Sequence, residues 1–229
     1  MRLLFSNSTT RPASRPATAS HLAERVRHLV PPHLRHLVGD FIQPRSRQHL
    51  GQTEVWAADN DAFSGFDPDR FRRMLDTMLQ GIVGRGGLRP PRFVTVPDVV
   101  GDHHATRDLF DQWSAEVGGR GFDRAFVLQN GIEADLERNG WNALPENAEA
   151  YFIGGDTAFK FSPAVAEITR HANRLGQWVH MGRVNSIKRM EYACAIGCDS
   201  CDGSGMARFP DAVLLPMLRA LSAGQMFLF

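Results

Sequence analysis

Carboxylate, amide and glycine residues recur directly after short apolar segments of this chain. They stand in Ala58-Asp59-Asn60-Asp61, Pro97-Asp98, Gln129-Asn130-Gly131, Gly154-Gly155-Asp156, His180-Met181-Gly182 and Asp199-Ser200-Cys201-Asp202-Gly203. Two carboxylates are the general means of breaking an N-glycosidic bond, because one can attack the sugar while the other transfers protons. At any single position, such a residue can equally begin a loop or cap a helix. Their repetition at successive segment ends instead predicts a site for a flat polar ligand.

The apolar segments have the length of β-strands and alternate with helical segments. We predict strands over residues 2–6, 54–58, 92–96, 124–129, 150–153, 177–181 and 197–201. Apolar residues at helical spacing predict helices over residues 71–82, 105–117, 165–175, 187–194 and 212–221, the fourth capped by Asn185 or Ser186 and the last kinked at Pro216. We therefore expect an α/β protein, a compact TIM-like (β/α)8 barrel. The carboxyl ends of its strands would meet on one face, where barrel enzymes place their chemistry.

Length and composition favour one globular domain over residues 1–229. The chain has 229 residues, of which 43% are hydrophobic and 22% are charged, and this composition excludes a disordered or collagen-like protein. No run approaches the roughly 18 apolar residues of a membrane span, so we expect no membrane contact. The acid-free residues 1–23 resemble an organellar transit peptide in composition, but Leu3-Leu4-Phe5 is more typical of a first buried strand.

Positive charge is concentrated near the amino terminus. Residues 1–50 contain eight arginines against Glu24 and Asp40, whereas the whole chain has a net charge of +1. Prolines interrupt residues 7–50, which we expect to form a basic irregular segment. The planar guanidinium group suits phosphate, so five arginines are predicted to contact nucleic acid: Arg25, Arg27, Arg35, Arg45 and Arg47. A solvated helix face is the alternative interpretation.

The residues at the strand ends resemble, in the same order, the tRNA-guanine transglycosylases. They resemble more closely the DNA-modifying relatives of that family, the DpdA-like proteins that insert 7-deazaguanines into DNA. Asp59-Asn60-Asp61-Ala62-Phe63 is similar to the family's Asp-Ser-Gly-Gly-Phe, which implies an acid/base role for Asp59 and stacking on the base for Phe63. Gly197-Cys198-Asp199-Ser200-Cys201-Asp202 is similar to Gly-Val-Asp-Met-Phe-Asp, which implies that Asp202 is the nucleophile.

The other matches, between about Val55 and Pro210, concern recognition of the base. One match is Val96-Pro97-Asp98, which resembles the segment whose aspartate recognises the edge of guanine. Another is Val127-Leu128-Gln129-Asn130-Gly131, which resembles Val-Gln-Gly-Gly. Ile153-Gly154-Gly155 resembles the glycine pair beneath the base, and His180-Met181-Gly182 resembles Leu-Met-Gly. The resemblance thus implies these substrate-binding residues: Phe63, Asp98, Gln129, Gly154, Gly155, His180, Met181 and Gly182.

The chain departs from the tRNA enzymes in two places. Their nucleophile is followed by Cys-x-x-Pro-Thr-Arg, but Asp202 is followed by Gly203-Ser204-Gly205-Met206-Ala207-Arg208. Those enzymes also carry a carboxyl-terminal zinc site of three Cys and one His, for which this chain has no residues left. We therefore expect neither that zinc subdomain nor a bound metal or cofactor.

Three cysteines lie within eight residues, at Cys194, Cys198 and Cys201. Their odd number and close spacing favour a reducing cytoplasm over a secreted, disulfide-bonded fold. The spacing also suits a 4Fe-4S cluster, or a zinc site completed by a histidine such as His180. We favour the simpler interpretation that they are small buried apolar residues.

Together these features predict a cytoplasmic enzyme, bacterial or from a phage-infected host, that exchanges guanine in DNA for a free 7-deazaguanine base. The exchange would pass through a covalent aspartyl-glycosyl intermediate. A transglycosylase acting on tRNA is the first alternative, and a non-catalytic barrel subunit that binds nucleic acid is the second. A homodimer is left open.

Overall fold

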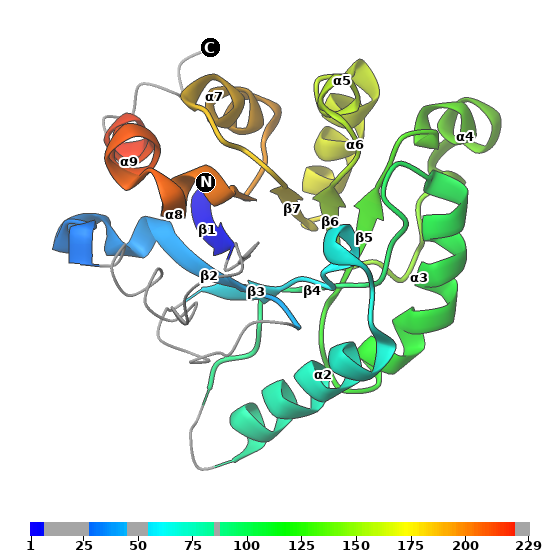
Figure 1. Cartoon of the computed structure of the whole chain (residues 1–229). Coiled ribbons are helices and arrows are strands. Elements are labelled where there is room, and N and C mark those ends of the chain that lie inside the picture. Colours follow the sequence, from blue (N-terminus) through cyan, green and yellow to red (C-terminus); the bar gives the residue numbers. More distant parts are fainter. Residues whose placement is uncertain (7–27, 45–54, 85–87, 223–229) are drawn as a thin grey trace.

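The structure, a computed structural model, describes residues 1–6, 28–44, 55–84 and 88–222. Within these residues, eight parallel strands close a barrel in chain order (Figure 1). They are β1 Arg2–Ser6, β2 Val38–Ile42, β3 Trp56–Ala58, β4 Val94–Thr95, β5 Arg124–Leu128, β6 Ala150–Ile153, β7 Trp178–Met181 and β8 Ser200–Asp202. The barrel closes by pairing of β8 with β1, where Cys201 lies opposite Leu3. The predicted α/β class and TIM-like barrel are confirmed.

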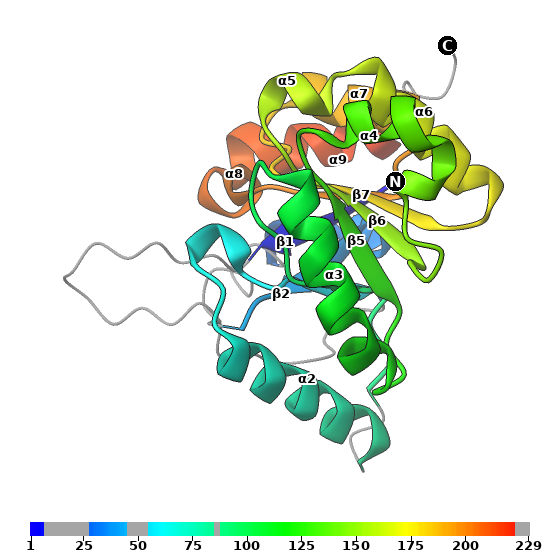
Figure 2. The same cartoon turned by 90° about the vertical axis from the view of Figure 1, so that its right-hand side faces the viewer.

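Helices cover the outside of the barrel (Figure 1, Figure 2). The α-helices are α2 Pro68–Val83, α3 His103–Gly118, α4 Ile132–Asn139, α5 Thr157–Lys160, α6 Pro163–Arg174, α7 Ile187–Ile196, α8 Ser204–Arg208 and α9 Leu215–Ser222. Shorter turns are η1 Pro32–Leu37, η2 Ala62–Ser64, η3 Gly140–Ala143 and the π-helical η4 Pro210–Leu214. Side-chain caps start several helices, and Ser186 rather than Asn185 caps α7 by accepting the N–H of Arg189. No helix in the described ranges is long and apolar enough to cross a membrane.

Alternation of side chains along the strands produces two apolar cores. The inner core fills the barrel with Phe41, Ala57, Phe93, Ala125 and Ala150. The outer core lies between strands and helices and includes Phe71 of α2, Phe110 of α3 and Ile168 of α6. Each fully buried side chain of this size stabilises the fold by about 1.5–3 kcal/mol. The strands are therefore held from both sides, which keeps their carboxyl ends in place.

The structure corrects the predicted irregularity of residues 7–50 at one place. Residues 38–42 form β2, preceded by the short helix η1. Pro31 and Pro32 lie at the start of η1, a position that tolerates proline, so they do not interrupt the strand. All five residues of β2 are buried, but Gly39 and Asp40 interrupt its apolar pattern. The sequence pattern therefore did not predict this strand.

Most predicted elements differ in bounds from the observed ones, and two of these differences concern the carboxyl-terminal part of the barrel. The last strand was expected over residues 197–201, but β8 spans Ser200–Asp202 because Gly197, with φ 96°, ends α7. The shift puts Asp202 at the carboxyl end of its strand. The last predicted helix is divided into η4 and α9. The division lies between Leu214 and Leu215, and Pro216 therefore stands in the first turn of α9, where proline is tolerated.

Candidate active site

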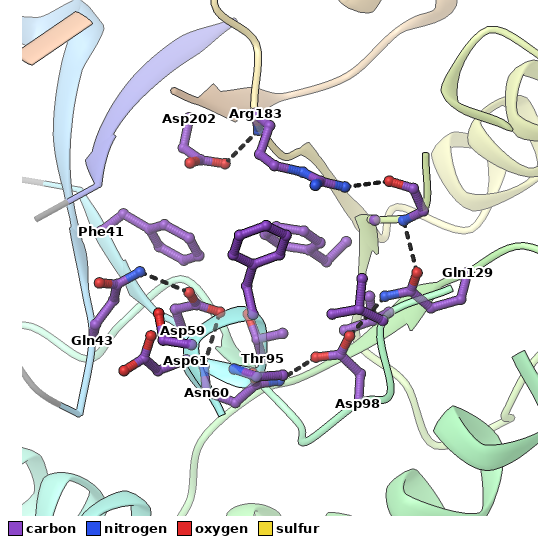
Figure 3. A pocket seen from close by; sticks show the side chains of 18 of the residues that line it. Phe41, Gln43, Asp59, Asn60, Asp61, Thr95, Asp98, Gln129, Arg183 and Asp202 are labelled. Carbon is purple, nitrogen blue, oxygen red and sulfur yellow. Dashed lines mark hydrogen bonds between the residues drawn. The ribbon is translucent and has the colours of Figure 1, made fainter. Parts of the chain in front are cut away.

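A cavity of about 320 Å³ opens at the carboxyl ends of the strands (Figure 3). Its lining includes seven of the predicted catalytic and substrate-binding residues: Asp59, Phe63, Asp98, Gln129, Gly154, Gly155 and Asp202. It also includes Phe41, Gln43, Asn60, Asp61, Thr95, Val127, Phe152, Arg183, Ser204 and Arg208. The volume is at the lower end of the range for small-molecule sites. The structure therefore brings residues from separate strand ends together in one cavity.

Asp59 directly follows β3 and lines the cavity. Its Oδ2 accepts a hydrogen bond from Nε2 of Gln43 at 3.1 Å, and its Oδ1 accepts one from the backbone N–H of Asn60 at 2.9 Å. Burial raises the pKa of Asp59, the bond from Gln43 lowers it, and the negative charges of Asp98 and Asp202 raise it again, so that the resulting pKa is about 7. A carboxyl group that titrates near neutrality can both donate and accept a proton.

Asp98, in the loop after β4, is the centre of a network of amide groups. Its Oδ1 accepts a bond from Nδ2 of Asn60 at 2.8 Å, and its Oδ2 accepts one from Nε2 of Gln129 at 2.7 Å. Oε1 of Gln129 in turn accepts the backbone N–H groups of Gly101 and Gly155 at 2.9 and 2.8 Å. Burial raises the pKa of Asp98, although both amides oppose the rise. The network fixes a carboxylate beside an amide, and carboxylate oxygens retain capacity to accept N–H groups of a ligand.

Asp202 is 7% exposed at the end of β8. Its Oδ1 accepts hydrogen bonds from Nε2 of His180 at 3.1 Å and from the backbone N–H of Arg183 at 3.2 Å. Both bonds go to the same oxygen. The carboxylate is thus oriented through Oδ1 while the residue lines the cavity.

His180 is fully buried inside the barrel, and a chain of hydrogen bonds sets its tautomer. Nε1 of Trp178 donates to Oγ of Ser200 at 2.8 Å, and this Oγ also lies 2.8 Å from Nδ1 of His180. Because the carboxylate of Asp202 only accepts hydrogen bonds, Nε2 of His180 carries the proton between them, and Nδ1 accepts the hydroxyl of Ser200. Three aromatic rings surround His180 with centroids 4.9–5.6 Å away: Phe41, Phe93 and Phe152. Asp202 is thus oriented from within the barrel.

The glycine pair after β6 permits close packing at the cavity wall. Gly155 has φ 63°, and a Cβ there would lie 2.3 Å from Cδ1 of Phe159. A Cβ on Gly154 would lie 2.8 Å from Nε2 of Gln129 and from the side chain of Val127. Substitution of either glycine would displace its neighbours.

The mouth of the cavity is basic, whereas its floor is acidic. We call Asp59, Asp98 and Asp202 the acidic floor. The guanidinium of Arg183 lies 5.2 Å from the ring centroid of Phe63, which is 73% exposed, and donates to the carbonyl of Gly155. Arg189 of α7 donates to the carbonyl of Arg183 at 3.4 Å, and Arg208 lines the same cavity. We call Arg183 and Arg208, which line the cavity, together with the adjacent Arg189, the basic mouth.

Three predicted substrate-binding residues support the cavity without lining it. His180 lies behind Asp202, and Met181 belongs to the outer core, because strand alternation turns its side chain away from the barrel interior. Gly182 lies against the ring of Phe152, which a Cβ would approach to 2.6 Å. The structure places these three residues behind the cavity wall, and their contact with a substrate stays a prediction.

Among the arginines predicted to contact nucleic acid, Arg35 lies within the described ranges. It is exposed on η1, before β2, and so at the amino ends of the strands, opposite the cavity. The structure does not bring it together with the site. The other four, Arg25, Arg27, Arg45 and Arg47, lie outside the described residues, and their phosphate contacts stay a prediction.

The sequence did not identify Gln43, Thr95 or Arg183 as residues of the site. Gln43 follows β2, the strand that was missed. Thr95 is 1% exposed, and its Oγ1 has no hydrogen-bond partner within the described residues. A threonine inside the apolar run of β4 was the one available signal for it. Arg183 reaches the cavity through a loop conformation, with φ 60°, that no local pattern indicates.

The three cysteines have the properties of buried thiols. Cys198 and Cys201 are buried, Cys194 is half-buried, and all three are free. Burial raises the pKa of Cys194 to about 11 and raises the pKa values of Cys198 and Cys201 as well. In the part of the chain that the structure describes, no three His, Cys, Asp or Glu side chains are arranged to hold a metal ion. Both ring nitrogens of His180 are engaged with Ser200 and Asp202.

The fold is similar to solved barrel structures of low sequence identity. A chain of the Amycolatopsis orientalis BexX/CysO complex has a TM-score of 0.50 and 14% identity, covering 97% of this chain and 88% of that chain. A native KDPGal structure has a TM-score of 0.49 and 14% identity, with 99% and 92% covered. Phosphoribosyl anthranilate isomerase from Thermus thermophilus has a TM-score of 0.41 and 16% identity, with 97% of both chains covered. No family model and no curated protein matches the sequence. The likeness concerns the fold alone, and that fold is the TIM-like barrel.

Proposed function

We propose that this chain is a base-exchange transglycosylase that replaces guanine in DNA with a 7-deazaguanine through a covalent aspartyl-glycosyl intermediate. The observation that carries the proposal is a pair of carboxylates in unlike environments within one cavity. Burial raises the pKa of Asp59 to about 7, whereas Asp202 is oriented by His180 and a backbone N–H. Enzymes that cleave glycosidic bonds through a covalent intermediate divide the roles of proton donor and nucleophile in this way.

In the first displacement, a carboxylate oxygen of Asp202 attacks C1′ of the target nucleotide. The bond between C1′ and N9 of guanine breaks, its electron pair leaves with the base, and Asp59 supplies the proton that neutralises the base. Because Oδ1 of Asp202 already accepts two hydrogen bonds, we assign Oδ2 as the attacking atom. The product is a glycosyl ester of Asp202.

In the second displacement, the incoming 7-deazaguanine gives its N9 proton to Asp59 and attacks C1′. The ester bond breaks and Asp202 is released as a carboxylate. Asp59 is then protonated again, so protons balance over the cycle. Two displacements at C1′ retain the β configuration of the nucleoside.

The acidic floor suits the edge of guanine that presents N–H donors. Asp98 offers carboxylate oxygens, held in position by Asn60 and Gln129. The buried hydroxyl of Thr95 offers a further hydrogen bond, and a ligand would supply the partner that it lacks in the described residues. Because 7-deazaguanine shares this edge with guanine, one floor can serve both the leaving and the incoming base.

The basic mouth suits the phosphates of a nucleotide chain. Phosphate is repelled by the acidic floor and attracted by Arg183, Arg189 and Arg208. A base must leave its stack to reach the cavity, which costs a few kcal/mol in a duplex. The exposed ring of Phe63 offsets part of this cost by stacking. The choice of DNA over tRNA rests on the resemblance of the strand-end motifs to DpdA-like proteins.

Mass spectrometry of nucleosides from cells that express the chain tests the substrate. We expect a 7-deazaguanine nucleoside in DNA and not in tRNA. Its presence in tRNA alone would replace DNA by tRNA as the substrate. Its absence from both, in cells supplied with free 7-deazaguanine bases, would refute the proposal.

Trapping on a denaturing gel tests the mechanism. The wild-type chain should form a covalent adduct with a guanine-containing oligonucleotide, and Asp202→Asn should not, because an amide cannot form the glycosyl ester. Asp199→Asn is the matched control. Asp199 directly precedes β8, its Oδ2 accepts the N–H of Val179 at 2.8 Å, and the variant should retain the adduct. An adduct that persists in Asp202→Asn would exclude Asp202 as the nucleophile.

A further inference from the structure

Lys160 is a buried charged residue that the proposed reaction does not use. It ends α5, is 6% exposed, and its Nζ donates to the carbonyl oxygen of Gly182. Burying a charged amine is unfavourable, and a neutral carbonyl compensates less than a carboxylate would. The presence of a lysine at this position therefore needs a reason beyond packing.

Lys160 and Asp202 bind the two ends of one peptide group. The carbonyl of Gly182 and the N–H of Arg183 belong to the same planar unit and point in opposite directions. Nζ of Lys160 donates to the oxygen, and Oδ1 of Asp202 accepts the N–H at 3.2 Å. An amine on the oxygen polarises the peptide so that its N–H becomes a stronger donor to the carboxylate.

This peptide is held in an uncommon conformation. Arg183 has φ 60°, and a non-glycine residue keeps such a conformation only where surrounding contacts require it. On either side, the N–H of Gly182 bonds to the carbonyl of Ile153 at 3.2 Å, and the N–H of Val184 bonds to the carbonyl of Asp202 at 2.6 Å. These two bonds hold the neighbouring N–H groups, whereas Lys160 donates to the carbonyl oxygen of Gly182 within the peptide itself.

Three charged groups face Lys160 from the elements around it. They are Arg183 of the loop after β7, Arg189 of α7 and Asp202 of β8. Burial and the two arginines lower the pKa of Lys160, Asp202 opposes them, and the resulting pKa is about 7. The proton on Lys160 and the charge on Asp202 are therefore coupled.

We propose that Lys160 is a positioning residue, which anchors the Gly182–Arg183 peptide so that its N–H keeps the carboxylate of Asp202 oriented in the cavity. The inference rests on the proposed function, because it is there that Asp202 is the nucleophile. A lysine that merely satisfies a carbonyl would affect folding but would leave the reactivity of Asp202 unchanged. The two roles are therefore separable by experiment.

The first test does not depend on activity. The sequence contains two lysines, Lys160 and Lys188, so the full chain labelled with ¹⁵N-lysine gives one side-chain signal from each in an NMR titration. We expect the midpoint of Lys160 near pH 7 in the wild type and at lower pH in Asp202→Asn, because the variant removes the charge that favours protonated lysine. Lys188, exposed on α7, is the internal reference. An unchanged Lys160 midpoint in a folded Asp202→Asn variant would overturn the proposal.

The second test separates binding from chemistry. Lys160→Met removes the donor and keeps the length of the side chain, and Lys188→Met is the matched control. We expect Lys160→Met to slow single-turnover adduct formation by about 10- to 100-fold at saturating oligonucleotide, with the half-saturating concentration nearly unchanged. A variant as fast as Lys188→Met would overturn the inference. If the wild type forms no adduct, the proposed function fails, and the titration still decides whether Lys160 is coupled to Asp202.

Discussion

Nε2 of Gln43 lies 3.1 Å from Oδ2 of Asp59, and this bond connects the end of β2 to the end of β3. The amide favours the ionised carboxylate and so lowers the pKa of Asp59, against the effect of burial. A residue on one strand thereby adjusts the proton affinity of the proposed proton shuttle on the next. Together with the negative charges of Asp98 and Asp202, these two effects leave the pKa of Asp59 at about 7.

Gln43→Leu is predicted to raise the pKa of Asp59, because the variant removes the hydrogen bond that opposes burial. The pH at which adduct formation changes should move upward in single-turnover assays that span about pH 5 to 9. Gln112→Leu, on an exposed position of α3, is the control and should leave the profile in place. A Gln43→Leu profile that matches the wild type would show that Asp59 does not govern the rate.

Asp59→Asn is predicted to change how stability depends on pH. The pKa of Asp59 is about 7 in the folded state against an ordinary value of 3.8, so the folded state binds more protons between about pH 4 and 7. Wild-type stability should therefore fall as pH rises through this interval, by at most about 1.4 kcal/mol per pH unit, relative to the variant. Urea unfolding at several pH values measures the difference. Asp69→Asn is the control, because that carboxylate is 80% exposed, and its curve of stability against pH should run parallel to the wild-type curve. An Asp59→Asn curve that also runs parallel to the wild-type curve would contradict the prediction.

Thr95→Val is predicted to have opposite effects on stability and on ligand binding. A buried hydroxyl without a partner costs about 1–3 kcal/mol, so its removal should stabilise the ligand-free chain. The same change should weaken binding of free 7-deazaguanine, measured by calorimetry. Thr106→Val is the contrasting control, because the hydroxyl of Thr106 bonds to both backbone groups of Val99 and its loss should destabilise the chain. Unaltered binding by Thr95→Val would remove Thr95 from the site.

Arg183→Gln is predicted to reduce the salt dependence of binding to single-stranded DNA. Each phosphate contact contributes a log-log slope of about −0.7 for single strands, so loss of one contact should make the slope shallower by that amount. Arg35→Gln is the control at the opposite end of the barrel and should leave the slope unchanged. If Arg35→Gln changes the slope and Arg183→Gln does not, the nucleic acid binds outside the basic mouth.

Replacement of all three cysteines by alanine is predicted to retain adduct formation in folded protein. Cys198 and Cys201 are buried, so the loss of their contacts should reduce stability by about 1–3 kcal/mol. Stoichiometric iron or zinc in wild-type protein prepared without oxygen would instead assign them a metal. Metal analysis and urea unfolding of both proteins give the comparison.

Much of the barrel could be predicted because its signals are local. The helical spacing of Phe71, Met74, Leu75 and Met78 predicted α2, and all four of these side chains are buried there. The strand β6 was predicted with its observed bounds, Ala150–Ile153. The helices α4, α5 and α8 were not predicted, and among the strands the exception was β2. Gly39 and Asp40 interrupt its apolar pattern, and only the closed sheet, which pairs Asp40 with both Phe5 and Trp56, makes a strand of these residues.

The sequence by itself determined which side chains stand at the strand ends, and therefore that Asp59, Asp98, Gln129 and Asp202 would share a face. Which of them would touch, and what would lie behind them, was decided only by the tertiary structure. Alternation along β7 turned His180 inward to Asp202 and Met181 outward, and the loop after it brought Lys160 and Asp202 to opposite ends of one peptide. These relationships join residues between 19 and 42 positions apart. They arise from closure of the barrel and from burial, neither of which is a property of any short stretch of sequence.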